Sequence, residues 1–292
     1  MTKEQKGDLF LLLAAMIGGL GFMSMKYLLE WKFTPFQIIV GRFFTATMVL
    51  YVFYLKELKK ITKDEWKAGS VLGFFLFLLF ALMTIGLQYT TPSVNAFLST
   101  LTAVIVPFIL WGIFHKRPNG ICFITAGMTS VGVALLSVTG DIKGGFGALL
   151  SFGASVAFAF QMALIGKFLQ RGDALHLALV EHLIVLILAL FVAVLQRQPL
   201  PDMTLPAIGH FFLLGIFCTG VYFVLQSVGQ KYTTASKAAI LLTTEAVFAS
   251  LAAAVFYGER LPLRGYIGCI IIFFAVVLTE IEPKQKITKN SR

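Results

Sequence analysis

Charged residues are scarce in this sequence. Asp, Glu, Lys and Arg together make up 13% of the 292 residues, whereas soluble domains carry roughly 25%. None of the four occurs in the 47 residues from Ala68 to Phe114, and that interval is long enough for two membrane spans of about 20 residues each. Because 58% of the residues are hydrophobic, the composition predicts a multi-pass membrane protein and excludes a soluble or peripheral one.

Cysteines and catalytic motifs are also scarce. Cys122, Cys218 and Cys269 each lie within an apolar run, which excludes a disulfide framework and a Cys-x-x-Cys metal site. The sequence contains no phosphate-binding loop, no His-Glu-x-x-His motif and no Gly-x-Ser-x-Gly motif. We therefore expect no catalytic residues, no metal, no cofactor and no direct use of ATP.

Ten apolar windows lie between charged or turn-forming residues. They fall at residues 8–28, 35–55, 68–88, 94–114, 120–139, 146–167, 175–195, 208–228, 236–256 and 264–282. Apolar residues cover both faces of each window, unlike the alternating strands of membrane barrels, and a helix satisfies its own backbone hydrogen bonds in lipid. The sequence therefore predicts an all-α membrane protein with ten transmembrane helices.

The net charge of +10 arises from short Lys and Arg clusters between these windows. Because the sequence has no basic helix and no polar stretch with stacking aromatics, we expect no nucleic-acid partner. With ten spans, one side of the membrane collects 17 Lys and Arg residues and the other collects six. Lys and Arg are concentrated in cytoplasmic loops, so both termini are expected on the cytoplasmic side of the inner (plasma) membrane.

Residues 86–117 and 229–260 resemble each other. Aligned without a gap, the two segments are identical at eleven of 32 positions, including Tyr-Thr-Thr at 89–91 and 232–234. Chance would give about three identities, so we infer a duplicated five-helix unit, with the first copy in residues 1–142 and the second in residues 143–292, which includes a basic tail. A unit with an odd number of spans re-enters the membrane upside down. Such inverted repeats recur in secondary transporters, whose substrate site lies near the midplane between the copies.

Two stretches resemble the drug/metabolite transporter superfamily, EamA type. They are GLQYTTPSVNAFLSTLTAVIVPF and TEAVFASLAAAVFYGERL, together with Pro35 seven residues before Arg42. The resemblance implies ten helices in two inverted repeats, usually in a prokaryotic inner membrane, and transport of small metabolites such as amino acids or sugars. Ala246 departs from the pattern, since many relatives have proline there, so a proline-induced helix break is not predicted after Glu245.

Charged and titratable residues within the predicted spans are candidates for function. Glu245 lies roughly 13 Å deep at 1.5 Å per residue, where a carboxylate costs about 2.5–3.5 kcal/mol; it either clamps two helices or binds substrate or a coupling proton. Arg42 lies about 10 Å below the outer end of its span, and either pairs structurally or attracts an anionic substrate group. Glu181 and His182 point about 100° apart on a helix, which favours a cytoplasm-facing structural role over a relay.

Uncharged polar and aromatic residues complete the candidate set. The polar ones either join helices by hydrogen bonds or line the binding site, and the aromatic ones either pack or stack on a ligand. The candidate substrate-binding residues are Phe22, Arg42, Gln88, Asn95, Phe97, Trp111, Gln161, Tyr222, Gln226 and Glu245, and Glu245 is also the candidate for proton coupling.

These features predict a secondary active or facilitative transporter that exports small organic metabolites, such as amino acids, by alternating access. Its expected partners are a small-molecule solute and the lipid bilayer, and it is expected to act as a monomer or homodimer. The alternative is an intramembrane enzyme acting on a lipid-linked substrate. That enzyme would need His, Asp or Glu concentrated at one membrane face, whereas the chain offers scattered single residues. A structural or receptor-like subunit would leave the duplication unexplained.

Overall fold

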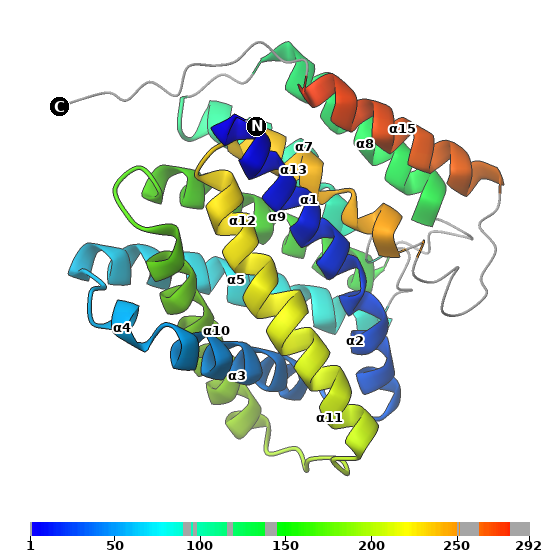
Figure 1. Ribbon diagram of the computed structural model, residues 1–292. Coiled ribbons are helices and arrows are strands. Elements are labelled where there is room, and N and C mark those ends of the chain that lie inside the picture. Colours follow the sequence, from blue (N-terminus) through cyan, green and yellow to red (C-terminus); the bar gives the residue numbers. More distant parts are fainter. Residues whose placement is uncertain are drawn as a thin grey trace.

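The computed structural model describes residues 2–89, 95, 98–115, 119–137, 145–249, 251 and 263–280, without the side chains of residues 22, 136, 137, 279 and 280. Within these residues all regular secondary structure is helical (Figure 1), which confirms the predicted all-α class. The helices of the first half are α1 (Lys3–Gly19), α2 (Gly21–Glu30), α3 (Pro35–Phe53), α4 (Leu55–Leu58), α5 (Lys63–Tyr89), α7 (Thr102–Gly112) and α8 (Gly120–Ser137).

The second half begins at α9 and contains an unusual π-helix. Its elements are α9 (Phe146–Phe168), α10 (Ala174–Gln196), α11 (Leu205–Phe212), the π-helix η1 (Leu213–Val221), α12 (Tyr222–Gln230), α13 (Ala235–Leu242) and α15 (Leu263–Glu280). The elements α11, η1 and α12 follow one another directly and form one continuous span, Leu205–Gln230.

Six helices in the described part of the chain are long and apolar enough to cross a membrane. They are Lys3–Glu30, Pro35–Phe53, Lys63–Tyr89, Phe146–Phe168, Ala174–Gln196 and Leu205–Gln230. Three shorter apolar helices cover Leu98–Gly112, Gly120–Leu135 and Leu263–Leu278. The chain is thus a multi-pass membrane protein, and ten crossings stay a prediction.

Side-chain caps explain where several helices begin. Thr34 accepts a hydrogen bond from the backbone of Gln37, the Gln37 side chain accepts one from the Thr34 backbone, and Pro35 takes the first helical position. Thr62 and Glu65 form the same reciprocal box at the start of α5. Thr234, from the second Tyr-Thr-Thr segment, caps α13 by accepting from the backbone of Lys237.

One helix breaks where no proline is present. After α13 the chain forms a turn at Thr243 and Thr244, and helical structure resumes at Glu245. The backbone N–H of Ala246 donates to the carbonyl of Thr243 over three residues instead of four, which tightens the helix locally. The absence of proline at position 246 therefore did not prevent the interruption, and Glu245 directly follows it.

Packing joins helices from distant parts of the sequence. Helix α5 packs along α9 and α10, α12 packs along α1, and α3 packs against α10 and η1. Helices α8 and α15 lie side by side at one edge of the molecule (Figure 1). The buried apolar residues form one main cluster that includes Leu76, Phe80, Met162 and Phe223.

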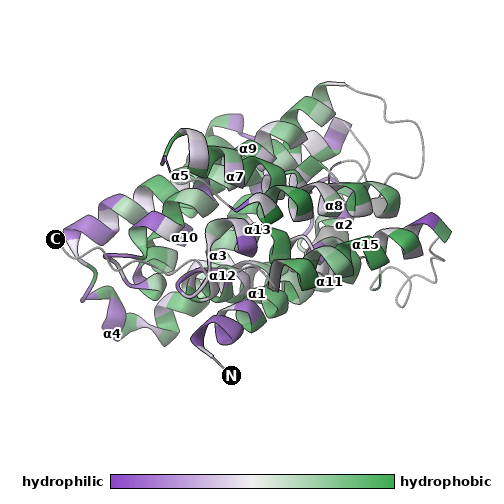
Figure 2. Ribbon diagram, turned by 90° about the horizontal axis from the view of Figure 1, so that it is seen from above, coloured by the Kyte–Doolittle hydropathy of each residue, from purple (hydrophilic) through white to green (hydrophobic). Residues whose placement is uncertain are grey.

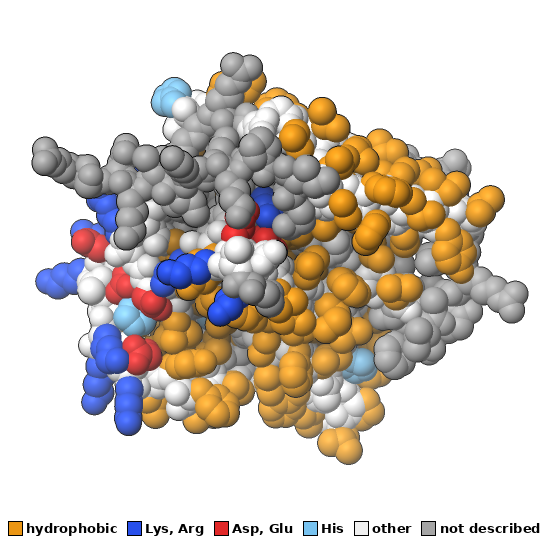
Figure 3. Space-filling view, turned by 45° about the horizontal axis from the view of Figure 1, so that its top comes forward, with side chains coloured by type: hydrophobic (Ala, Val, Ile, Leu, Met, Phe, Trp, Pro, Cys, Tyr) orange, Lys and Arg blue, Asp and Glu red, His pale blue; other side chains and the backbone are white. Residues whose placement is uncertain are grey.

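The outer surface is apolar over most of the helices. Hydrophobic colouring extends along the helices, whereas hydrophilic residues concentrate near the N-terminus, α4 and the helix ends (Figure 2). Large side chains such as Phe53, Leu195 and Phe273 are more than half exposed. On the face shown in Figure 3, hydrophobic side chains cover most of the described surface, and charged side chains gather at one side. An apolar belt with charges at its rim matches a lipid environment.

Candidate functional site

Arg42 lies buried in the middle of the bundle. Its side chain extends from α3 to η1, where Nε donates to Thr219 Oγ1 at 2.8 Å and a terminal nitrogen donates to the Cys218 carbonyl at 3.0 Å. The guanidinium carbon lies 4.2 Å from the centre of the Phe80 ring, a cation–π distance. Only 5% of Arg42 is exposed. The structure thus places this charge inside the protein and not at the lipid interface.

The π-helix η1 supplies the partners of Arg42. Short π segments inside α-helices are rare and are frequently found at functional sites. Here the Thr219 hydroxyl donates to the carbonyl of Leu214, five residues earlier, at 2.7 Å, and accepts the Arg42 Nε at the same time. The hydroxyl is therefore fixed by two bonds and orients the guanidinium.

Tyr222 and Glu245 form a second polar pair close to Arg42. Tyr222 lies one helical turn after Cys218, and its hydroxyl donates to Glu245 Oε2 at 3.2 Å. Tyr222 is buried and Glu245 is partly exposed. A Cβ atom added at Gly18 would lie 2.8 Å from Glu245 Cδ, so this glycine gives the carboxyl its space. Arg42 and Glu245 thus bond to the η1–α12 span at two positions, Cys218 and Tyr222, that are one helical turn apart.

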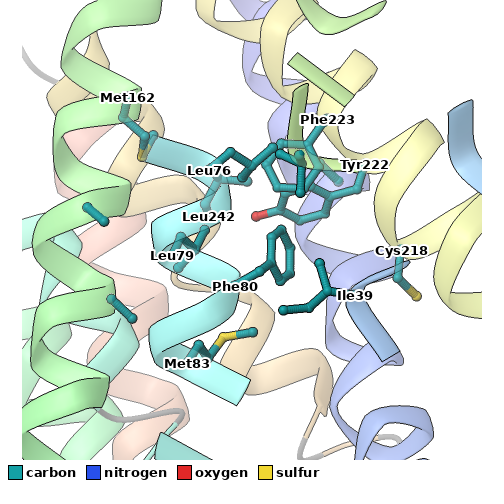
Figure 4. Close-up of a cluster of buried hydrophobic side chains, with 14 of the residues drawn as sticks. Ile39, Leu76, Leu79, Phe80, Met83, Met162, Cys218, Tyr222, Phe223 and Leu242 are labelled. Atoms are coloured by element: carbon teal, nitrogen blue, oxygen red, sulfur yellow. The ribbon is translucent and has the colours of Figure 1, made fainter. Parts of the chain in front are cut away.

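Aromatic rings fill the space between these polar groups. Phe80 and Phe223 pack edge to face at 5.9 Å, and Phe43 packs against Phe80 at 5.1 Å. Figure 4 shows the Tyr222 hydroxyl oxygen pointing into this cluster, beside Phe80 and Phe223. His182 contacts both Phe43 and Phe223. The apolar rings keep the dielectric around Arg42 low, which strengthens its electrostatic interactions.

A chain of amides forms a second buried network. Gln161 Nε2 donates to Glu181 Oε1 at 2.8 Å, and Gln226 Nε2 donates to Gln161 Oε1 at 3.1 Å. Gln226 also donates to Gln230 Oε1 at 3.4 Å. Gln161, Glu181 and Gln226 are completely buried. The structure therefore joins two of the predicted residues, Gln161 and Gln226, directly to each other. Glu181 and Gln230 extend this network at its two ends, and Arg42 is not part of it.

Three further predicted residues, Asn95, Gln88 and Trp111, lie on other parts of the fold. Asn95 is buried and donates to the Met83 carbonyl and to Ser151 Oγ, each at 2.9 Å, which is the helix-joining role. Gln88 is exposed at the end of α5. Trp111 is 49% exposed on α7, with its ring 6.4 Å from Phe123. The Phe22 side chain and the whole of Phe97 lie outside the described residues.

Glu181 and His182 differ in part from their predicted setting. Their side chains reach different partners, as expected of neighbours on a helix: Glu181 bonds to Gln161, whereas His182 Nε2 lies 3.4 Å from the Thr219 carbonyl. Both residues are completely buried, so the expected cytoplasm-facing position is wrong. Helix α10 packs on α5, α3 and α12, so both side chains lie inside the bundle.

Sequence reasoning missed Thr219, Phe80 and Phe223. A threonine within an apolar run gives no sign of a π-helix, so Thr219 carried no usable signal. The two phenylalanines did carry one, because Phe80 and Phe223 are 143 positions apart, the same offset that aligns Gly86 with Gly229. Extending the repeat alignment six residues upstream would have paired them.

The charged end of the bundle holds its own ion pairs. Lys237 Nζ lies 3.0 Å from Asp8 Oδ2 and 3.2 Å from Glu4 Oε1, linking α13 to α1. On α4, the hydrogen bond from Lys60 holds the pKa of Glu57 below its usual value. Among the described residues, no three His, Cys, Asp or Glu side chains are grouped so as to hold a metal ion.

Comparison with known proteins gives a consistent result. The family described as "EamA-like transporter family" matches the chain twice, over residues 5–138 and 145–281. An "Uncharacterized transporter" from Archaeoglobus fulgidus is 28% identical over 284 residues, which cover 96% of this chain and 87% of that protein. Another from Clostridium kluyveri is 21% identical over 96% of this chain and 95% of its own length. A crystal structure with 15% sequence identity has the same fold, with a TM-score of 0.78 over 96% of this chain and 97% of that one.

Proposed function

Since the chain belongs to the EamA-like transporter family, we propose that this transporter carries small zwitterionic metabolites, amino acids or related compounds, by alternating access. One observation carries the proposal. A buried arginine and a carboxyl group of opposite charge bind the η1–α12 span one helical turn apart, at Cys218 and Tyr222. Two fixed charges of opposite sign match the carboxylate and the ammonium group of an amino acid.

Arg42 is suited to bind the carboxylate of the solute. A guanidinium presents several N–H groups in a planar fork that fits a carboxylate. Its hydrogen-bond partners here, the Thr219 hydroxyl and the Cys218 carbonyl, are neutral. In the described part of the chain no carboxylate forms an ion pair with it. A buried cation with neutral partners only is costly, and an anionic ligand would offset that cost.

Glu245 is suited to bind the ammonium group. Its Oε2 accepts one hydrogen bond, from Tyr222, which leaves acceptor capacity on the carboxylate. The side chain is partly exposed and follows a helix interruption. Interrupted helices at the membrane midplane are a recurrent feature of transporter sites. Glu245 is therefore accessible to a solute, whereas the buried Arg42 becomes accessible only when the bundle opens.

The packing of the helices supports two inverted repeats, within residues 1–142 and 143–292. Helix α5 packs on α9 in the way that α12 packs on α1, and α7 packs on α9 in the way that α13 packs on α1. Helices α3 and α10 pack on each other, as do α8 and α15. This exchange of partners is the pattern of a twofold axis that relates two five-helix units.

Two glycine crossings support the same symmetry. An added Cβ at Gly86 would lie 3.0 Å from the Gly147 carbonyl, and one at Gly229 would lie 2.9 Å from the Gly7 carbonyl. A tyrosine follows each crossing: Cβ atoms added at Gly147 and Gly7 would meet Tyr89 and Tyr232, respectively. The first crossing joins α5 and α9, which are the third and sixth of the ten proposed spans. The second joins α12 and α1, which are the eighth and first, the equivalent pair in the other repeat.

The proposed site lies between the two repeats. Arg42 belongs to the first repeat, whereas Tyr222 and Glu245 belong to the second. A solute held by both charges would therefore contact both repeats, and rocking one repeat against the other would expose it to each side of the membrane in turn. The lysines and arginines of the loops support cytoplasmic termini in an inner membrane, and export rests on the family resemblance. The unit could act as a monomer or homodimer.

A ligand-stabilisation screen on the purified protein tests the solute class. A solute that binds the folded state raises the melting temperature, and the rise grows with the logarithm of the solute concentration above its dissociation constant. We expect stabilisation by one or more free amino acids, and none by the matching amino-acid amide or N-acetyl derivative, since each lacks one of the two charges. Equal stabilisation by the amide and the free amino acid would contradict the role of Arg42. Stabilisation only by sugars or nucleosides would overturn the proposed solute class.

A further inference from the structure

The Glu181 carboxyl is completely buried and only half satisfied. Oε1 accepts the hydrogen bond from Gln161 Nε2 at 2.8 Å, whereas Oε2 has no hydrogen-bond partner among the residues that the structure describes. In the described residues, no lysine, arginine or histidine forms an ion pair with it. An ionised carboxylate in this position would lack a compensating positive charge, which costs several kcal/mol in a protein interior. The site therefore needs a positive charge that the described side chains do not supply.

The other titratable groups around α10 are committed elsewhere. The buried or partly buried ones on α10 and on its neighbouring helices include Arg42, Tyr51, Glu57, Glu65, His176, His182 and Tyr222. Lys56, Lys63, Asp64, Lys67 and Tyr89 on α4 and α5, Lys167 on α9 and Asp173 at the start of α10 are exposed. Arg42 binds Thr219 and Cys218, and Tyr222 binds Glu245. His176 lies between Glu57 and Glu65 at the charged end of the bundle, and Lys167 lies over the Phe114 ring. Tyr51 lies 3.5 Å from the Leu179 carbonyl, and Asp173 caps α10 and pairs with Lys231.

The amide chain contains acceptor atoms that receive no hydrogen bond. Gln226 Nε2 donates both to Gln161 and to Gln230, while no described residue donates to its own Oε1. Together with Glu181 Oε2, this makes two buried acceptor atoms without a donor in one network. Buried acceptors are normally satisfied. A proton on Glu181 Oε2 would convert one of these acceptors into a donor and remove the charge at the same time.

We propose that Glu181, with Gln161, Gln226 and Gln230, forms a proton-binding site whose proton is exchanged during the transport cycle. The proton binds as H⁺ to Oε2 and leaves as H⁺, so no other reactant is needed. This inference rests on the proposed transport function, but it concerns an ion site separate from the Arg42–Glu245 pair. It also assigns proton coupling to Glu181 instead of Glu245.

The network ends one residue away from an exposed lysine and has a link to the substrate site. Gln230 is the last residue of α12, and the exposed Lys231 follows it. At the other end, His182 is next to Glu181 in the chain and contacts the Thr219 carbonyl, while the Thr219 hydroxyl holds Arg42. A shift of α10 on loss of the proton would therefore reach the Arg42 partners directly.

Infrared spectroscopy of the purified full-length protein tests the protonation itself. We expect the carbonyl stretching band of a dry, protonated carboxylic acid at neutral pH, present in the wild type and in Glu245→Gln, and absent in Glu181→Gln. If Glu181→Gln does not fold, Gln161→Leu replaces it, and this variant is expected to shift the band because Oε1 loses its donor. A spectrum unchanged by Glu181→Gln, or by Gln161→Leu, would overturn the proposal.

Proton movement tests the coupling. Proteoliposomes that enclose a pH-sensitive dye are given a gradient of a mixture of the proteinogenic amino acids. The wild type is expected to move protons together with amino acids, and in Glu181→Gln the ratio of proton to amino-acid flux is expected to fall to zero. Amino-acid flux without proton flux in the wild type would overturn this inference and leave the proposed function intact. Absence of amino-acid flux in the wild type would instead contradict the proposed function, while the infrared result still decides the proton site.

Discussion

Gly18 and Glu245 are in direct contact across the interface between α1 and the segment that follows α13. A Cβ atom added at Gly18 would lie 2.8 Å from Glu245 Cδ and 2.7 Å from Cε2 of Tyr222. Distances below 3 Å between such atoms require something to move. The position of the carboxyl therefore depends on the absence of a side chain at residue 18.

Replacing Gly18 by alanine tests this dependence. Gly18→Ala is expected to displace Glu245 and Tyr222, and to weaken amino-acid binding about tenfold, or about 1.4 kcal/mol. The measurement is the dissociation constant of the amino acid, obtained from how the melting temperature rises with amino-acid concentration. Gly127→Ala is the matched control, because an added Cβ there meets nothing within 4 Å. Equal affinities in the two variants would exclude Glu245 from the site.

The two glycine crossings are expected to respond alike. Gly86→Ala and Gly229→Ala each place a Cβ about 3 Å or less from atoms of the facing helix, and such overpacking costs about 1–3 kcal/mol. Thermal unfolding should show a similar loss for both variants. Gly209→Ala serves as the control, since its Cβ would be in open space. A loss at one crossing and none at the other would argue against equivalent repeats.

The ion pair between Lys237 and Asp8 should stabilise the packing of α13 on α1. Both side chains are buried, with Nζ and Oδ2 3.0 Å apart. Lys237→Met removes the ammonium group that lies 3.0 Å from the buried Asp8 carboxylate, and we expect it to destabilise the protein by about 3–5 kcal/mol. Adding Asp8→Leu should recover a large part of that loss, as measured in a double-mutant cycle. Simple additivity of the two losses would show that the pair is not coupled.

Membrane orientation can be read by labelling single cysteines. Lys59 and Gln198 are exposed, and the proposed topology places them on opposite sides of the membrane. Cys269 is only partly buried, so it is first replaced by serine to prevent its labelling. An impermeant thiol reagent applied to intact cells is expected to label Gln198→Cys, and to label Lys59→Cys only after the cells are opened. The reverse pattern would place the termini outside.

The positions of the helices could be predicted because they follow from the local amino-acid composition. The window at 68–88 lies within α5 (Lys63–Tyr89), and the window at 146–167 matches α9 (Phe146–Phe168) within one residue at its end. The capping threonines at 34 and 234 are likewise local signals. Runs of apolar residues and capping threonines can be recognised in the sequence without knowing which other helices a helix will pack against.

The site was only partly predictable, because it depends on how each helix is rotated. Gln88 and Gln161 are the same residue type in similar apolar settings, yet one is exposed and the other completely buried. The partner of Gln161 is Glu181, on the next helix, and nothing in the local sequence indicates that pairing. The π-helix around Thr219, which packs against α3, likewise has no signal in the local sequence. The depth of a residue within its membrane span could be estimated by counting along the chain. The direction in which its side chain points could be known only from the fold.

Counterflow in proteoliposomes tests the central claim most directly. Vesicles loaded with a mixture of unlabelled proteinogenic amino acids and diluted into trace labelled amino acids should accumulate label transiently when they contain the wild-type protein. Arg42→Ala should abolish this accumulation, and Arg42→Lys should reduce it because the planar fork is lost, whereas the exposed Arg171→Lys should match the wild type. Accumulation that persists at the wild-type rate in Arg42→Ala, or its absence in the wild type for every amino acid, would contradict the account.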